Sequence, residues 1–359
     1  MESIKDFTEH TLDDALTVVK GRLSNSVGSK IRLLLRNPAR RFCEETGDVV
    51  YDGNGPIGFQ AAIPRIGYYG KHRFLSVAGG MLAMKKGASP AALISLMERT
   101  IAPRHGSVMF FGNTAIPISM KLNSLLGVDG IGCESCGKIR FAVFKWGGFV
   151  KACLHGRLPA IAERLTDLCG SFLSPVFYRG RRSDVSCVQV GEFAPEVFDA
   201  FFEKYLERND GVVLSRTAEE LAWAFGDGLR DGRNLLVIAT NPSGLQGYVV
   251  VRAINSERTR WMVVDWIALE NNKDVLSDLL RHAVRILRTE SSAVFLECIG
   301  FRMDVQDIIK RHLPFTRKAP NNSTNYRAYD SNLKQGLKQA DRKGWFFGPY
   351  DGDRFLAGS

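Results

Sequence analysis

One short segment in the first half of the chain has the residue types of an anion-binding helix start. It reads Lys85-Lys86-Gly87-Ala88-Ser89-Pro90. Serine is a good N-cap and proline suits the first helical turn, so a helix should begin here. The start of a helix has unpaired donors and a positive dipole end. We therefore expect the N–H groups of Ala91 and Ala92 to face an anion, with the two lysines adding positive charge.

Two carboxylates lie inside apolar strands of the second half. Asp265 stands in Val263-Val264-Asp265-Trp266, and Glu297 ends Val294-Phe295-Leu296-Glu297. A buried charge without a partner is costly, so each carboxylate should either face a cleft from a strand end or be paired in the core. We favour the cleft.

A metal site is not expected from the cysteine pattern. Cys133-Glu134-Ser135-Cys136 has zinc-like spacing, but no second Cys or His pair follows at a suitable distance. Two free thiols in a glycine-rich loop are the better interpretation. We predict no bound metal.

The elements that must position these residues run in the same order twice. Gly58 follows a hairpin-like stretch, and Gly112 ends a later apolar strand. The matching glycines of the second half are Gly247 and Gly300. The spans are 54 (112 − 58) and 53 (300 − 247), and the copies lie 189 (247 − 58) and 188 (300 − 112) residues apart. This agreement predicts a duplicated domain.

Each copy should hold two helices, an antiparallel group of strands, a helix, a further strand and a last helix. In the first half we expect helices at 12–23, 30–42, 89–99 and 118–126 and strands at 48–51, 57–63, 73–84 and 107–111. In the second half we expect helices at 195–206, from 217, at 274–288 and at 305–312, and strands at 235–239, 247–253, 260–269 and 293–297. The predicted fold class is α/β, of the α+β kind with mixed sheets. A polar, basic linker at 178–184 separates domains 1–180 and 181–359.

Composition is that of a globular protein with anionic partners. The 359 residues are 45% hydrophobic and 24% charged, with a net charge of +10. These values exclude a disordered or fibrous chain and favour phosphorylated cofactors, acidic carrier proteins or nucleic acid as partners. No apolar run approaches a membrane span, and the amino terminus lacks signal-peptide order. We expect a cytoplasmic protein.

The order of elements resembles the GNAT superfamily of acyl-CoA-dependent acyltransferases. The segment Phe111-Gly112-Asn113, followed by Ser119-Met120-Lys121-Leu122 and Leu126-Gly127-Val128, looks like the strand-Asn-helix-Leu-Gly-Phe segment of that family, with Val128 in place of Phe. The stretch from Trp345 to Asp353 looks like the final strand of tandem GNAT proteins. The resemblance therefore implies two tandem GNAT-like domains.

The resemblance also implies a cofactor site. In GNAT enzymes the pyrophosphate of coenzyme A lies on backbone N–H groups where the fourth strand turns into a helix. The residues implied are Leu82, Met84, Lys85, Lys86, Gly87, Ala88, Ser89, Ala91, Ala92 and Asn113. The corresponding turn of the second half, 269–274, has two carboxylates and no glycine. We expect acyl-CoA or an acyl-carrier thioester as co-substrate in the first domain, no permanently bound cofactor, and a substrate-shaping second domain.

Acyl transfer to an amine needs a base and an acid. The resemblance aligns Asn123 with a tyrosine that often supplies the proton in the family, and asparagine cannot do so. His72 and Ser76 are the nearest candidates for the base. Asp265 and Glu297 could orient an amine substrate.

We therefore predict an N-acyltransferase that moves an acyl group from acyl-CoA, or a carrier-protein thioester, to an amine of a small metabolite. Two alternatives stay open. An aminoacyl-tRNA-dependent amide-forming enzyme would also use paired GNAT-like domains and a basic surface, and a GNAT-like module could bind without catalysis. An acyl carrier protein and a second copy of the chain are further candidate partners, and tRNA ranks below them.

Overall fold

The computed structural model describes residues 2–20, 27–115, 117–131, 138–154, 159, 161–163, 165–167, 184–299, 305–318, 323–339, 345–346 and 350–351. The chain forms two compact units. The first comprises Met1–Glu134, Asn209–Ala224 and Pro320–Gly358, and the second comprises Ser135–Arg208, Phe225–Ala319 and Ser359. The boundary expected between residues 180 and 181 lies outside the described residues, and each unit draws segments from both sides of it.

The first unit is built on a mixed sheet. Its described strands are β1 (Ser3–Asp6), β2 (Gly47–Asp52), β3 (Gly55–Tyr69), β4 (His72–Met84), β5 (Met109–Ala115), β6 (Asp129–Ile131), β9 (Val212–Leu214), β15 (Ser323–Ala328) and β16 (Trp345–Phe346). The order is β1-β2-β3-β4-β5-β15-β6, with β9 paired to β3 and β16 to β9. All neighbours along the main path are antiparallel except β4 and β5, which are parallel.

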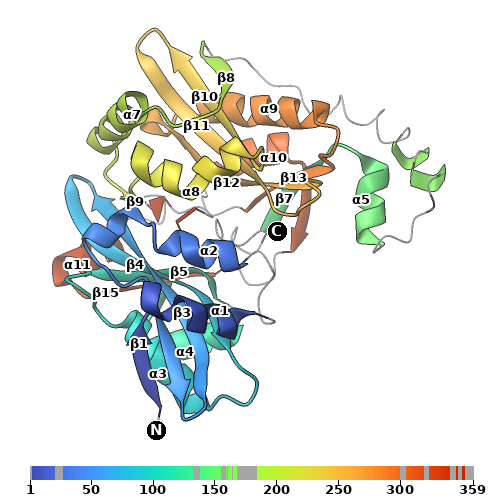
Figure 1. The fold of residues 1–359 in the computed structure, drawn as a ribbon. Coiled ribbons are helices and arrows are strands. Elements are labelled where there is room, and N and C mark those ends of the chain that lie inside the picture. The colour runs from blue at the N-terminus through green and yellow to red at the C-terminus, as the bar shows by residue number, and fades with distance from the viewer. Residues whose placement is uncertain are drawn as a thin grey trace. The chain divides into compact units, whose positions relative to one another are not determined.

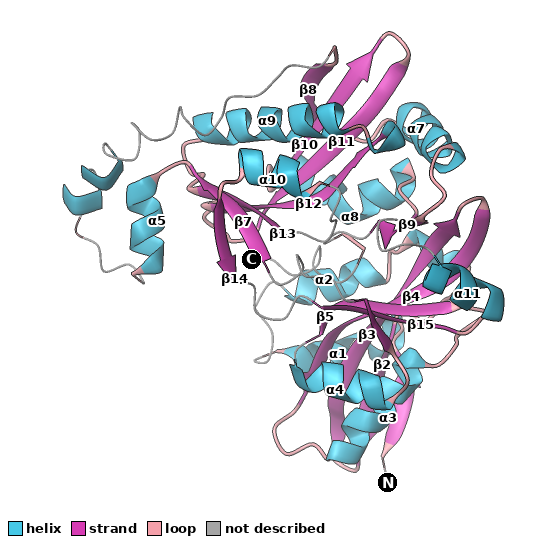
Figure 2. Cartoon of the chain, turned by 180° about the vertical axis from the view of Figure 1, so that it is seen from behind, coloured by secondary structure: helices cyan, strands magenta, loops and turns pink. Residues whose placement is uncertain are grey.

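Helices cover both faces of this sheet (Figures 1 and 2). The described helices are α1 (Leu12–Val19), α2 (Val27–Leu34), α3 (Pro90–Ile101), α4 (Pro117–Leu125) and α11 (Ser331–Gln339), with short 3-10 helices at Glu9–Thr11 and Pro38–Arg41. The helix expected at 30–42 is broken: α2 ends at Leu34, and Pro38 begins a separate 3-10 helix, since proline is tolerated in a first helical turn but not in a helix interior. Figure 1 shows α1 in front of the sheet, and Figure 2 shows α3 and α4 in front of the other face.

The second unit repeats this plan. Its strands are β7 (Lys138–Val143), β8 (Ser186–Val190), β10 (Asn234–Asn241), β11 (Gly244–Ala253), β12 (Arg260–Ala268), β13 (Phe295–Ile299) and β14 (Phe315–Lys318), in the order β14-β7-β13-β12-β11-β10-β8. Its helices are α5 (Trp146–Cys153), α7 (Pro195–Glu207), α9 (Lys273–Thr289) and α10 (Gln306–His312), with a 3-10 turn at Leu269–Asn271. Helix α8 (Ala218–Arg230) begins in the first unit and ends in the second.

The two units exchange one strand each. In the first unit β15 lies between β5 and β6, although it comes from the end of the chain. In the second unit β7 lies between β13 and β14, although it precedes all the other strands of its sheet. In both sheets the inserted strand is antiparallel to both of its neighbours. The duplication predicted from the glycine spacing is therefore confirmed as two sheets of the same topology, each completed by a strand from the other half of the chain.

Candidate functional site

Strands β4 and β5 part after a short parallel ladder. The paired positions run from Ser76 opposite Met109 to Ala78 opposite Phe111. Strand β4 then continues to Met84 and β5 to Ala115 without further pairing to each other. Gly79 and Gly112 are the first residues beyond the ladder, and we call them, with the strand residues that follow, the β4–β5 fork. At a fork of this kind, a ligand of extended shape can reach the unpaired edges of the two strands.

A bulge in β4 accounts for the fork. Ala61 of β3 is opposite Gly80, whereas Phe59 is opposite Ala83, so two residues of β4 face the single residue Gln60. Met81, one of the two, has φ of +50°, in the left-handed region. A β-bulge bends its strand and increases the local twist. The bulge therefore turns β4 away from β5 just beyond the last paired residues.

Two buried amides stand over the fork glycines. A Cβ atom on Gly79 would lie 2.7 Å from the Phe110 ring and 3.7 Å from Nε2 of Gln60, and one on Gly112 would lie 2.8 Å from Oδ1 of Asn325. Gln60 is 6% exposed and Asn325 is 4% exposed. Within the described residues, Oε1 of Gln60 and both polar side-chain atoms of Asn325 have no hydrogen-bond partner. Because buried polar atoms are normally satisfied, these amides point to a polar ligand or to water at the fork.

Asn123 carries a third amide of this kind. It lies in α4, which packs against β5, and is buried. Its Oδ1 atom also has no partner in the described part of the chain. The residue that the GNAT resemblance aligned with a proton donor can therefore accept a hydrogen bond at Oδ1, but it cannot supply an acidic proton.

The helix start predicted at Ser89 is present, and it is partly capped by protein. Helix α3 begins at Pro90 with Ser89 as N-cap, and the Ser89 hydroxyl accepts a 3.0 Å hydrogen bond from the Ala92 N–H. The expectation that the Ala92 amide is open is therefore wrong, because the cap residue takes it. Among the described residues the amides of Gly87 and Ala91 have no acceptor. Gly87 has φ of +88°, which favours glycine.

Charges of both signs lie at this helix start. Lys85 is half-buried and Lys86 exposed, and neither forms an ion pair with a described residue. The Glu2 carboxylate accepts a 2.6 Å hydrogen bond from the Ser89 hydroxyl. An anion approaching Ala91 would meet two lysines and one competing carboxylate.

The remaining implied cofactor residues have structural contacts or lie outside the description. The side chains of Leu82, Met84 and Ala88 pack against the buried cluster formed by Val50, Ile57, Ala92 and Leu96. The side chain of Asn113 lies outside the described part of the structure. Roles of these residues toward a cofactor stay predictions.

The two candidate bases are not brought to the fork. Ser76 is buried, and its hydroxyl donates a 3.1 Å hydrogen bond to the carbonyl of Arg65. Its side chain lies on the opposite face of β4 from Gly79, since strand residues alternate. His72 is exposed at the start of β4, about 23 Å from Gly79 at ~3.3 Å per residue. Their catalytic roles stay predictions.

Asp265 and Glu297 are paired in the core of the second unit and do not face a cleft. Asp265 accepts a 2.6 Å hydrogen bond from the Tyr248 hydroxyl. The two oxygens of Glu297 lie 2.8 Å from Arg260 Nη2 and 2.7 Å from Arg317 Nη2. Both carboxylates are 2% exposed. The favoured cleft interpretation is thus replaced by the core alternative, because each carboxylate has partners within its own unit.

The second unit has a matching fork but a less suitable helix start. Strand β12 pairs with β13 only from Arg260 to Met262. At the start of α9, the Asn272 side chain accepts hydrogen bonds from the N–H groups of Asp274 and Val275, at 3.0 and 3.2 Å. With those donors taken and a carboxylate at Asp274, this turn is poorly suited to a polyphosphate.

Gln60, Gly79 and Asn325 were not predicted as site residues from the sequence. The pair Gly79-Gly80 inside a strand pattern was an available signal, because glycine within a strand often marks a bulge or a close backbone approach. No local signal marks Asn325. Its place beside Gly112 depends on the insertion of β15 between β5 and β6.

Comparisons with known proteins agree on the fold. No protein-family model matches the sequence, and the search of curated proteins gave no match. A probable N-acyltransferase from Enterococcus faecalis superposes with a TM-score of 0.58 at 13% identity, covering 92% of this chain and 72% of its own. A GCN5-related N-acetyltransferase from Kribbella flavida gives 0.56 at 13%, covering 91% and 71%. Saccharomyces cerevisiae N-myristoyltransferase, solved with myristoyl-CoA and inhibitors, gives 0.55 at 11%, covering 96% and 86%. At these identities the likeness concerns the fold, and the chain has the tandem GNAT fold of these N-acyltransferases.

Proposed function

We propose that the first unit binds an acyl-CoA or acyl-carrier thioester at the β4–β5 fork, and that the chain transfers the acyl group to an amine of a small metabolite. The observation that carries the proposal is the fork, where Gln60 and Asn325 hold unsatisfied amides. The pantetheine arm of such a thioester is extended and contains amide groups, so it can pair with strand edges and side-chain amides. The bound myristoyl-CoA of the yeast N-myristoyltransferase, which shares the fold, supports this choice of co-substrate.

The proposed anion site is the start of α3. A diphosphate there would meet the amides of Gly87 and Ala91 and the charges of Lys85 and Lys86. The chain's net charge of +10 favours an anionic co-substrate, whether acyl-CoA or an acyl-carrier thioester. None of the described helices is long and apolar enough to cross a bilayer.

A second candidate function is thioester binding without transfer. It is favoured by the positions of the candidate acid and base, since His72 is distant from the fork, Ser76 faces away and Asn123 has no acidic proton. Transfer would break the thioester C–S bond, form an amide C–N bond and move a proton from the amine toward the leaving thiolate. Water could carry that proton if no side chain does.

Calorimetric titration with acetyl-CoA and longer acyl-CoAs at low salt tests the proposal, followed by a free-thiol assay across a panel of amines. Thiol release that depends on the amine supports transfer. Binding without release supports the binding module. Absence of binding to every acyl-CoA and carrier thioester contradicts both, and copurified tRNA whose binding falls steeply with salt would favour the tRNA-dependent alternative.

Replacing Gly112 with valine should weaken acyl-CoA binding at least about tenfold, a cost of ~1.4 kcal/mol. A Cβ at this position already meets Oδ1 of Asn325 at 2.8 Å, so the branched side chain would displace that amide and fill the fork. Titration calorimetry measures the change. Gly130→Val is the matched control, because Gly130 pairs with Asn325 from the other side and a Cβ there has no atom within 4 Å. Equal effects of the two variants would contradict the assignment.

Replacing Glu2 with glutamine should strengthen acyl-CoA binding about two- to fivefold at low salt. The change removes a negative charge from the start of α3 and keeps an oxygen that can accept from the Ser89 hydroxyl. The gain should shrink as salt screens the field. Glu98→Gln, an exposed change near the other end of α3, should leave affinity unaltered. Weaker binding by Glu2→Gln would place the diphosphate elsewhere.

A further inference from the structure

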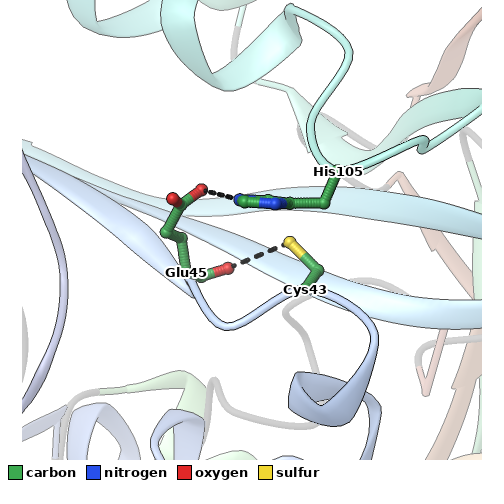
Figure 3. Close-up of side chains that lie close together, drawn as sticks. All are labelled: Cys43, Glu45 and His105. Atoms are coloured by element: carbon green, nitrogen blue, oxygen red, sulfur yellow. Dashed lines mark hydrogen bonds and ion pairs between the residues drawn. The ribbon is translucent and has the colours of Figure 1, made fainter.

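A thiol, a carboxylate and an imidazole converge in the first unit, away from the residues considered above (Figure 3). Cys43 and Glu45 precede β2, and His105 lies in the connection between α3 and β5. His105 Nε2 is 2.7 Å from Glu45 Oε2, and the Cys43 thiol donates a 3.5 Å hydrogen bond to the Glu45 carbonyl. One ligand atom from each residue lies within 4.8 Å of the other two.

We propose that Cys43, Glu45 and His105 form a binding site for a zinc-type divalent cation. Thiolate, imidazole and carboxylate are the ligand types that zinc takes, and three protein ligands leave a fourth tetrahedral position for water. Bonds of about 2.0–2.3 Å place tetrahedral ligand atoms roughly 3.3–3.8 Å apart. The observed separations reach that geometry through movements of about an ångström. A thiolate and a carboxylate beside a neutral imidazole also balance the double charge of the ion.

The backbone directs these side chains toward one another. His105 has φ of +45° and Gly106 has φ of +76°, so two successive left-handed residues turn the α3–β5 connection back toward Glu45. A non-glycine residue held in this region usually has a compensating role. Binding the ion at His105 would supply one, since the ion would tie the segment before β2 to the connection that begins β5.

The positive charge of the neighbouring Arg104 does not exclude a cation from this site, because nearby carboxylates compensate it. Arg104 Nη1 lies 3.9 Å from Glu45 Oε2, but its guanidinium is paired with the fully buried Asp48. Arg99 pairs with the same carboxylate at 2.8 Å and with Asp6 at 2.5 Å, so two carboxylates face the two arginines. The site therefore lies beside a largely charge-compensated network.

A nucleophilic role for Cys43 fits the structure less well. The side chain is buried, and burial followed by the charge of Glu45 raises the pKa of its thiol to about 11. A nucleophilic cysteine needs an accessible thiolate, which this environment disfavours. A divalent ion would replace the thiol proton, which leaves to solvent, and no bond to carbon or change of oxidation state is involved.

The experiment uses the full chain after treatment with a chelator. Zn²⁺ is titrated by calorimetry, and Co²⁺ is added separately to detect the thiolate-to-cobalt charge-transfer band. We expect one equivalent of zinc, the cobalt band, and a rise in Tm of roughly 5–10 °C at zinc near 100 times its Kd. Cys43→Ser should abolish the cobalt band and reduce zinc affinity at least about 100-fold, since even the loss of a residue that only supports a metal ligand costs about 10–100-fold.

Three further variants test whether zinc binding depends on the proposed ligands and not on other cysteines. His105→Asn should also lose zinc, and it should fold because His105 is exposed and asparagine tolerates positive φ. Cys153→Ser, at an exposed cysteine, should bind zinc as the parent does. The double variant Cys133→Ser/Cys136→Ser should also bind normally. Zinc binding that survives Cys43→Ser and His105→Asn, or that is lost in the Cys133/Cys136 variant, overturns the proposal. Neither result bears on acyl-CoA binding.

Discussion

Arg216→Met should lower the free energy of unfolding by about 3–5 kcal/mol, the range for breaking a buried ion pair at one partner. Arg216 Nη2 lies 2.8 and 2.9 Å from the two carboxylate oxygens of Asp351. Both side chains are 0% exposed. The variant leaves the carboxylate of Asp351 buried without its guanidinium, where water cannot replace the lost interaction.

The pair belongs to a larger buried group in the first unit, which adds to the expected loss. The Tyr350 ring is close to two guanidinium groups, with its centroid 4.1 Å from Arg65 Cζ and 5.1 Å from Arg216 Cζ. Arg65 Nη1 donates a 3.1 Å hydrogen bond to the Tyr350 carbonyl. Burial raises the pKa of Glu220, while Arg65, a hydrogen bond from Ser215 and Arg216 act in the opposite direction. Removing Arg216 therefore leaves both buried carboxylates less compensated.

Urea unfolding measures the effect, with a surface pair as the control. Arg41 lies 3.2 Å from Glu219 in the same unit, with both side chains more than half exposed. Arg41→Met should change stability by less than about 1 kcal/mol. The double variant Arg216→Met/Asp351→Leu should recover much of the loss, since an apolar pair carries no uncompensated charge. A loss below about 1 kcal/mol for Arg216→Met alone would show that Asp351 is neutralised in another way.

Elements governed by local signals were predictable from sequence. The helix expected at 89–99 is α3, Pro90–Ile101, because Ser89 and Pro90 define its start. The strand expected at 73–84 is β4, His72–Met84. In the second unit the helix expected at 274–288 is α9, Lys273–Thr289, whose buried residues recur at helical spacing. Capping residues and apolar periodicity involve residues close together in the chain, so they can be recognised in a single sequence.

Features that depend on distant segments were not predictable. Strand β7 was missed, and its place beside β13 requires pairing across about 150 residues of chain. The fork depends on a bulge that only the β3–β4 register reveals. The partners of Arg65 and Arg216 come from residues 350 and 351, and His105 meets Glu45 across 60 positions. Charge and residue type identify such groups as candidates, but tertiary packing decides which of them meet.

The second unit should lose stability in mild acid through His312, the last residue of α10. His312 is 1% exposed, and its Nε2 lies 2.7 Å from the Ser277 hydroxyl. Its Nδ1 atom has no partner among the residues that the structure describes. Burial is the main cause that lowers the His312 pKa to about 4, with Arg281 and Arg311 adding to it and Asp278 opposing it. The folded protein therefore holds this imidazole neutral.

The sign of the pH effect follows from that lowered pKa. The unfolded chain takes up the proton near the ordinary histidine pKa of about 6.5, so the stabilisation is complete above that pH and is lost as the pH falls toward about 4. The loss is about 2 kcal/mol at pH 5 relative to pH 7. His312→Gln does not titrate and can still bond to Ser277, so its unfolding free energy should fall less over this interval. His282→Gln is the comparison: burial, followed by Arg285 and Arg281, also lowers the His282 pKa, but this residue is only partly buried, so its replacement should reduce the acid loss less than His312→Gln does. If the parent and His312→Gln lose equal stability between pH 7 and 5, protonation of His312 is not the cause, and other titrating groups control the acid sensitivity of this unit.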